Sequence, residues 1–429
     1  MFSGLFRTPV PPRSSTRFSG GRIVVLAAIT LGMTGPGQTP GISVFVDPMM
    51  AALDLSRSQV STAYLIGTLG GAVAMPRVGQ LIDERGARMA MAIVGGLFGL
   101  VLAGMAGVTG LVTLTIGFVG IRMLGQGGLT LVATTSVAPW FDRRRGMAIG
   151  VTIAIGSGLI ALVPVGSEVL ISQAGWRTTW LILAAVILLT VLPIAARGMI
   201  DDPTHVGQRV DGDPEPHPDD PSPPAKVSFT RGEALRTPMF WVMTAAVAAT
   251  GMIGTGLAFH QIDLLGEQGL TATQAAGNFI PQTIAALTTM LMVGRLIDWL
   301  APRWVLLGSM AILSVAMLVV PFVAPGWTAV AYGVAVGASG SSVRALEAAS
   351  FPRMFGLASL GRIRGVVTAI SVASTAFGPL ALSLGHDLTG SYRQVLLVLL
   401  VIPVAVAVAG FLAPVPRRPP RPAATNEVR

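Results

Sequence analysis

The chain has 429 residues, of which 52% are hydrophobic and only 11% are Asp, Glu, Lys or Arg, and its formal net charge is +9. Because a soluble domain carries roughly 25% charged residues, this composition excludes an ordinary soluble protein and predicts an all-α membrane protein. The absence of cysteine excludes disulfides and thiolate metal sites. The four histidines follow no zinc-like spacing, so we expect no metal and no other cofactor.

Apolar stretches of about 20 residues, long enough to cross the hydrocarbon layer, recur along the chain. Six precede a polar interruption, at 22–47, 58–78, 89–108, 111–138, 147–171 and 176–196. Six more follow it, at 239–264, 275–297, 304–323, 327–351, 365–385 and 393–413. The sequence therefore predicts 12 transmembrane helices in two six-helix bundles.

The polar interruption divides the chain into parts. It is rich in proline and acidic residues and cannot bury enough apolar surface to fold alone, which is typical of a linker. We expect a cytoplasmic N-terminal tail at 1–21, a first bundle at 22–197, a cytoplasmic linker at 198–237, a second bundle at 238–413 and a cytoplasmic C-terminal tail at 414–429.

The positions of the basic residues predict the orientation. If the N-terminus is cytoplasmic, three of the 29 Lys and Arg residues fall outside and two lie within spans, which leaves 24 on the cytoplasmic side. Such a bias is typical of cytoplasmic loops. The positive charge is therefore a topology signal rather than evidence for nucleic-acid binding, and we expect a multi-pass protein of the inner (plasma) membrane.

The two halves repeat each other. Three pairs of segments match in the same chain order, at offsets of 219, 215 and 219: 32–37 with 251–256, 79–83 with 294–298, and 145–146 with 364–365. Two similar six-helix halves that enclose a site near the membrane midplane are a known plan of transporters. We therefore expect pseudo-symmetric bundles.

Segment 79–88, GQLIDERGAR, resembles the signature loop between helices 2 and 3 of the major facilitator superfamily, and Arg122 with Gly125 resembles its helix 4 motif. The resemblance implies the major facilitator fold and a monomeric secondary active transporter that works by alternating access. It also implies that the loop and its counterpart in the second half gate the cytoplasmic side, through Gly79, Asp83, Arg85, Gly86, Arg88 and Asp298.

Within that superfamily, segment 140–150 and the pair Phe240-Trp241 resemble the monocarboxylate transporters and their bacterial relatives, which include oxalate–formate exchangers. This resemblance implies a small organic anion as the solute, moved by proton symport or by exchange. The span at 275–297 has no charged residue before Arg295, where such relatives often place a substrate-binding arginine. A drug or metabolite exporter, working as a proton antiporter, is the alternative.

Two arginines lie within predicted spans. Arg122 lies about 11 residues into its span, roughly 16 Å at 1.5 Å per residue, and a charge near the midplane is expensive and typical of function. It is a candidate anion ligand, or else a structural arginine bonded to carbonyls of the first span. Arg344 and Glu347 share a helix face; they are a candidate anion site and proton acceptor, or else an ion pair or a cytoplasmic latch.

Polar side chains mark further candidate positions. The first span contains GPGQTPG, which cannot continue a regular helix, and such backbone is tolerated where it lines a cavity. We expect substrate contacts there and along the span at 275–297, from Thr34, Gln38, Ser43, Asn278 and Gln282. His260 and Asp263 share a face and could accept transported protons, although loop-edge residues have the same pattern.

The predicted partners are a small-molecule solute, protons and the lipid bilayer. A membrane-embedded enzyme would need a catalytic dyad, metal ligands or a nucleophile elbow, and the sequence contains none of these patterns. An exporter would need an acidic residue deep in the first or fourth span, which the sequence lacks. The anion transporter is therefore the favoured hypothesis.

Overall fold

The computed structural model describes residues 18–212, 229–297, 299–356 and 360–414, and within these ranges every regular element is a helix. The candidate gating residue Asp298 lies outside the described residues. So do most of both predicted tails and the centre of the predicted linker.

The first half begins with a broken helix, as the sequence predicts. Pro36 and Pro40 are in the first turns of η1 and α2, where a missing N–H is tolerated. The elements of this half are α1 (Gly20–Gly32), η1 (Gly35–Gly37), α2 (Thr39–Leu53), α3 (Arg57–Met105), α4 (Leu111–Ile121), the π-helix η2 (Arg122–Leu129), α5 (Thr130–Thr135), η3 (Ala138–Trp140), α6 (Arg145–Pro193) and the π-helix η4 (Ile194–Gly198).

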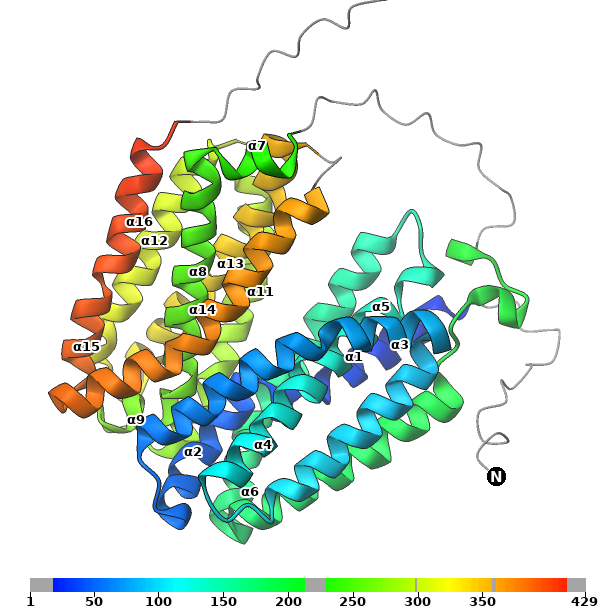
Figure 1. Ribbon diagram of the computed structural model, residues 1–429, viewed down its shortest axis with the longest axis horizontal. Helices are drawn as coiled ribbons and strands as arrows, with labels where there is room; N and C mark the ends of the chain where they lie inside the picture. The colour runs from blue at the N-terminus through cyan, green and yellow to red at the C-terminus, as the bar shows by residue number, and fades with distance from the viewer. Residues whose placement is uncertain (1–17, 213–228, 298, 357–359, 415–429) are drawn as a thin grey trace, which may run out of the picture.

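Two elements of this half each contain two helical segments. Both α3 and α6 have 49 residues, which as one straight helix would measure about 74 Å, more than twice the hydrocarbon thickness of about 30 Å. Each is broken at a glycine in the left-handed region, with φ 79° at Gly86 and 78° at Gly175. Glycine adopts this conformation without strain, so the chain turns back there (Figure 1).

The second half follows three short elements, η5 (Pro203–Val206), η6 (Val210–Gly212) and α7 (Arg231–Leu235). Its helices are α8 (Pro238–Phe259), α9 (Gln261–Gly266), α10 (Ala272–Gly277), α11 (Phe279–Leu296), α12 (Pro302–Val319), η7 (Val320–Phe322), α13 (Trp327–Phe355), α14 (Leu360–Thr389), α15 (Tyr392–Leu399) and α16 (Val401–Leu412).

Eight helices among the described residues are long and apolar enough to cross a membrane, and α3 and α6 count once each among them. The all-α membrane fold is therefore confirmed. The count of 12 spans and the bounds of the five predicted segments stay predictions.

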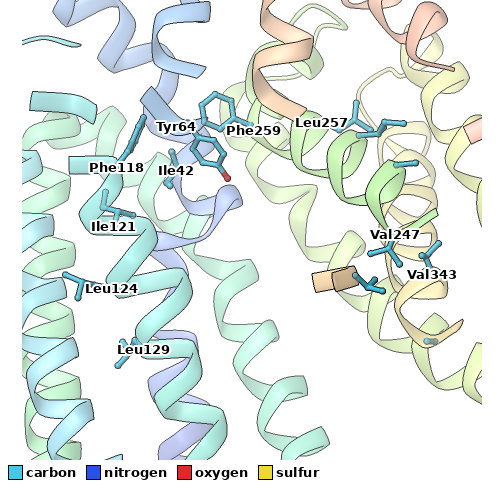
Figure 2. Close-up of a cluster of buried hydrophobic side chains, with 14 of the residues drawn as sticks. Ile42, Tyr64, Phe118, Ile121, Leu124, Leu129, Val247, Leu257, Phe259 and Val343 are labelled. Carbon is cyan, nitrogen blue, oxygen red and sulfur yellow. The ribbon is translucent and has the colours of Figure 1, made fainter. Parts of the chain in front are cut away.

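The two halves form a V (Figure 1). They are apart at the end that carries α7, and they meet at the opposite end near α2 and α9. We call the first end the linker face and the second the far face. Near the far face, Tyr64 of α3 lies against Phe259 of α8 with ring centroids 4.6 Å apart, and Figure 2 shows the two rings side by side. The buried apolar core of each half lies on either side of this contact (Figure 2).

Candidate functional site

A cavity of about 360 Å³ lies between the two halves. The first half contributes Pro40 from α2 and Ile160 and Ala161 from α6, and the second half provides the other lining residues, from α8, α11, α13 and α14. Its volume is within the range of small-molecule sites, roughly 300–1,000 Å³. We call it the central cavity. Its walls are mostly apolar, and its polar lining side chains are Thr250, Thr255, Gln282, Thr283, Arg344, Ser371 and Thr375.

Arg344 is the charged residue of the central cavity. It lies 17 residues after Trp327, the first residue of α13, and its side chain is exposed to the cavity. Glu347, one turn further along α13, pairs instead with Nε of Arg364 at 3.4 Å. Among the described residues the guanidinium of Arg344 has neither a salt bridge nor a hydrogen bond. The structure therefore presents to the cavity a cation that forms no salt bridge among the described residues, with the charge of Glu347 acting on it from one turn away.

A chain of side-chain amides forms the cavity wall beside α11. Nε2 of Gln282 donates to Oε1 of Gln261 at 2.6 Å and to Oδ1 of Asn278 at 3.1 Å. Asn278 donates in turn to the carbonyl of Ala329 at 2.6 Å. Gln282 lines the cavity, whereas Asn278 is buried behind it. The two predicted residues therefore lie together, and Asn278 orients Gln282.

Arg122 is buried and bonded within the first half. Its Nε donates to Thr68 at 3.0 Å, and its Nη1 donates to the carbonyl of Gly37 at 3.3 Å and to Thr39 at 3.5 Å. The guanidinium also lies 4.7 Å from the ring centroid of Tyr64. The carbonyl of Gly37 belongs to the first span. Arg122 therefore makes the hydrogen bond to a first-span carbonyl that we expect of a structural arginine.

Arg122 also lines a second, larger cavity of about 960 Å³ between α3, η2 and α14. Its walls include Gln126, Arg364 and several apolar side chains of α3, and it shares Thr375 with the central cavity. Arg122 therefore forms hydrogen bonds within the first half and also lines a cavity between the halves.

The local backbone explains how Arg122 reaches the first span. Arg122 begins the π-helix η2, and such segments are frequent at functional sites. A Cβ added at Gly37 would lie 2.9 Å from Cα of Gly125. Only glycine allows these two backbones to approach so closely, and their contact brings the Gly37 carbonyl within reach of the guanidinium.

The polar residues of the broken first span bond locally. Gln38 donates to Thr34 at 3.0 Å and to Thr130 at 3.5 Å, and Ser43 donates to the carbonyl of Pro40 at 2.8 Å. None of Thr34, Gln38 and Ser43 lines the central cavity or the larger one. Their substrate contact stays a prediction.

The candidate proton pair His260 and Asp263 lies at the far face, away from both cavities. Nε2 of His260 donates to the carbonyl of Pro379 at 2.9 Å, since a carbonyl can only accept. Asp263 accepts from Tyr392 at 2.8 Å and pairs with Arg57 at 3.2 Å. His260 and Asp263 form no hydrogen bond with each other in the described part of the chain. They therefore do not share a proton in this structure.

The signature loop lies at the linker face. Asp83 and Arg85 are exposed, whereas Arg88 is buried and donates to the carbonyls of Ala195 and Ala196. A Cβ added at Gly79 would meet nothing within 4 Å, which leaves room for an approaching helix. Arg88 therefore fastens the loop to η4, which follows α6 in the same half, and the gating roles stay predictions.

Two residues that bond candidate site residues were missed by the sequence analysis. Asp201 accepts from the backbone N–H of Arg88 at 2.7 Å, and Gln261 bonds the cavity residue Gln282. Asp201 lies in the predicted linker, where an acidic residue looks like any other solvated charge. Gln261 is next to His260, and no spacing links it to a residue 21 positions away.

The family model described as Major Facilitator Superfamily matches residues 23–281, more than half of the chain. The chain belongs to the Major Facilitator Superfamily. The expected fold is confirmed, and the protein is a multi-pass membrane transporter of a small solute rather than an enzyme.

Within the superfamily, the chain is similar to the oxalate:formate antiporter of Oxalobacter formigenes, with 27% identity over 267 residues. The match spans 60% of this chain and 59% of the relative, so it covers less than two thirds of the relative's length.

Solved structures support the fold alone. Two crystal structures of a bacterial homologue of the human lysosomal transporter Spinster, both inward-facing, one unoccupied and one occupied, each match with a TM-score of 0.68. Their identities are 17% and 16%, and the matches cover 92% and 91% of this chain and 96% of each structure.

Proposed function

We propose that this member of the Major Facilitator Superfamily is a secondary active transporter of a small, monocarboxylate-like organic anion. It works by alternating access, coupled to protons or to a counter-anion. The observation that carries the proposal is Arg344, an exposed cation in the central cavity that has no salt bridge among the described residues.

The chemistry of the central cavity fits one carboxylate. A guanidinium presents a planar set of donors that matches a carboxylate, and a hydrogen bond to a charged group contributes about 1.5–3 kcal/mol. Thr250, Gln282 and Thr283 add neutral polar groups, while Ile160 and Phe279 offer apolar surface. An anion with a small apolar body could place its carboxylate against the polar side chains and its apolar part against Ile160 and Phe279.

The oxalate:formate antiporter, to which the chain is similar, supports carboxylates as the solute class and exchange as one form of coupling. The signature loop and the basic residues on the same side of the spans support a cytoplasmic linker face in the inner membrane. On that basis the V is open to the cytoplasm.

Proton coupling has its best candidate in Glu347. Its side chain is 12% exposed, lies one turn from Arg344 and pairs with Arg364 at 3.4 Å. Protonation of Glu347 would release Arg364, which lines the larger cavity. Proton binding to Glu347 could therefore change the net charge of the Glu347–Arg364 pair beside the larger cavity.

The larger cavity favours a second candidate function. With about 960 Å³ and apolar side chains such as Leu69, Val73 and Val372 in its walls, it would hold a larger apolar solute. A drug or metabolite exporter is therefore the alternative.

Thermal stabilisation of the purified protein tests the proposal, because a ligand that binds the folded form raises apparent stability by RT ln(1 + [L]/Kd). We expect stabilisation by formate, acetate, lactate or oxalate and none by acetamide, which is a neutral match for acetate. Stabilisation by lipophilic cations with no response to any carboxylate would contradict the anion proposal and favour the exporter.

A further inference from the structure

An ion pair joins the two halves at the far face. Nη2 of Arg57, the first residue of α3, lies 3.1 Å from Oδ1 of Asp47 and 3.2 Å from Oδ1 of Asp263. Asp47 belongs to the same half as Arg57, whereas Asp263 is on α9 in the other half. The Arg57 side chain is only 13% exposed, while the side chains of Asp47 and Asp263 are 39% and 27% exposed, so the pair is partly shielded from water.

Further contacts surround this pair. The hydroxyl of Tyr392 donates to Oδ2 of Asp263 at 2.8 Å, which fixes the carboxylate toward the first half. Ser58, next to Arg57, donates to Asp387 at the end of α14. The far face is thus held shut by charge and hydrogen bonding as well as by packing.

The short helix α9 lies between this ion pair and the central cavity. Its first residue, Gln261, is fully buried, donates to the carbonyl of Ala275 at 2.8 Å and accepts from Gln282 at 2.6 Å. Gln282 lines the central cavity. Only one residue separates Gln261 from Asp263, so α9 is bonded at once to the cavity wall and to the first half.

The chain is not continuously helical before α9. His260, with φ −94° and ψ 9°, separates α8 from α9. A break of this kind lets α9 change its angle while α8 stays in place.

We propose that α9 is the gate of the far face. Asp263 holds it closed through Arg57, and Gln261 is a positioning residue that ties it to the cavity wall through Gln282. The far face opens when both connections are released. Because Gln282 lines the cavity, a solute that takes its hydrogen bonds weakens the second connection.

Distance measurements between spin labels test the gate in the full chain. The sequence has no cysteine, so labels attach only where cysteine is introduced. Gln173→Cys in α6 and Ala324→Cys after η7 place one label on each half at the far face, and both residues are exposed. The separation between the labels reports opening.

We expect Arg57→Gln and Asp263→Asn each to raise the open fraction roughly threefold to tenfold, which is the effect of weakening a partly shielded ion pair. Two matched controls keep their contacts within one half: Arg177→Gln, whose side chain bonds the carbonyl of Val108, and Glu267→Gln, which pairs with His386. Both should leave the distances unchanged. Asp263→Glu keeps the charge and should restore closure.

Gln261→Met tests the connection to the cavity, with Gln268→Met as its control in the adjacent turn. We expect Gln261→Met to raise the open fraction, and we expect the effects of Gln261→Met and Gln282→Met to be less than additive, since both remove the hydrogen bond between these two side chains. Additive effects of the two changes, or an equal effect of Gln268→Met, would remove Gln261 from the gate.

If Asp263→Asn opened the far face no more than Glu267→Gln, the ion pair would not be the closing contact and the gate proposal would be overturned. The measurement is made without added solute. Its outcome is therefore separate from that of the anion proposal, which depends on binding at Arg344.

Discussion

The carboxylate of Glu347 lies 3.4 Å from Nε of Arg364, whereas Arg344, one turn away on α13, forms no salt bridge among the described residues. Arg344 lines the central cavity and Arg364 lines the larger one, so a solute anion in the central cavity would lie beside the guanidinium of Arg344. Release of Arg364 from Glu347 would then add a second positive charge nearby. The distribution of charge, rather than cavity size, favours an anion.

Arg122 and Arg344 should respond differently to the same substitution. Arg122→Gln removes donors from buried acceptors in the first half, and we expect it to destabilise the protein by about 1–3 kcal/mol. Arg344→Gln removes no bond among the described residues and should change stability by less than about 0.5 kcal/mol. Thermal unfolding in detergent measures both. If Arg122→Gln left stability intact and weakened solute binding, with Arg122→Lys between it and wild type, Arg122 would belong to the binding site.

The two arginines that end the signature loop form a second matched pair. Arg88 is buried and donates to two carbonyls of η4, whereas Arg85 is exposed. We expect Arg88→Ala to lower the free energy of unfolding by about 1–3 kcal/mol and Arg85→Ala to change it by less than about 0.5 kcal/mol. If both variants lost the same free energy of unfolding, the hydrogen bonds of the buried Arg88 would contribute no more to stability than the exposed Arg85 does.

The sequence predicted features that depend on local chemistry and composition. Apolar stretches marked the helices, and the GPGQTPG segment marked the break that became η1 between α1 and α2. The signature loop marked the connection between two helices, and the structure places the turn at Gly86, where φ is positive. The amide pair Asn278 and Gln282 followed from helical spacing.

Contacts between distant segments could not be predicted in the same way. Spacing put His260 with Asp263, but the fold bonds His260 to Pro379 and pairs Asp263 with Arg57. Both partners are far away in the chain, and a periodic pattern carries no information about which helices meet. For the same reason Arg364 as the partner of Glu347 was not foreseen.

Asp83 tests the predicted gate of the linker face. It is exposed while the halves are apart, and the family resemblance predicts that it meets a helix N-terminus of the other half on closure. That contact would be worth about 0.3–1 kcal/mol. We therefore expect Asp83→Asn to slow transport while solute binding survives. Transport assays in vesicles and binding to purified protein separate the two effects, and loss of binding in proportion to transport would assign Asp83 to the site.

Orientation in the membrane can be measured with single cysteines, because the chain has none of its own. Gln173 lies at the far face and Gln80 near the linker face, and both are exposed. We expect a membrane-impermeant maleimide to label Gln173→Cys in intact cells and Gln80→Cys only after permeabilisation. The reverse pattern would overturn the predicted cytoplasmic position of the linker face.

Binding of a carboxylate to Arg344 variants tests the central claim most directly. Arg344→Lys keeps the charge but loses the planar donor set, and Arg344→Gln loses both. With the carboxylate that best stabilises the wild-type protein, titration calorimetry should rank affinity as wild type, then Lys, then Gln. The loss from wild type to Gln should be about 1.5–3 kcal/mol, or roughly tenfold to a hundredfold in Kd. If Arg344→Gln bound that carboxylate as tightly as the wild-type protein, the unpaired cation would not be the anion site, and the proposed function would be contradicted.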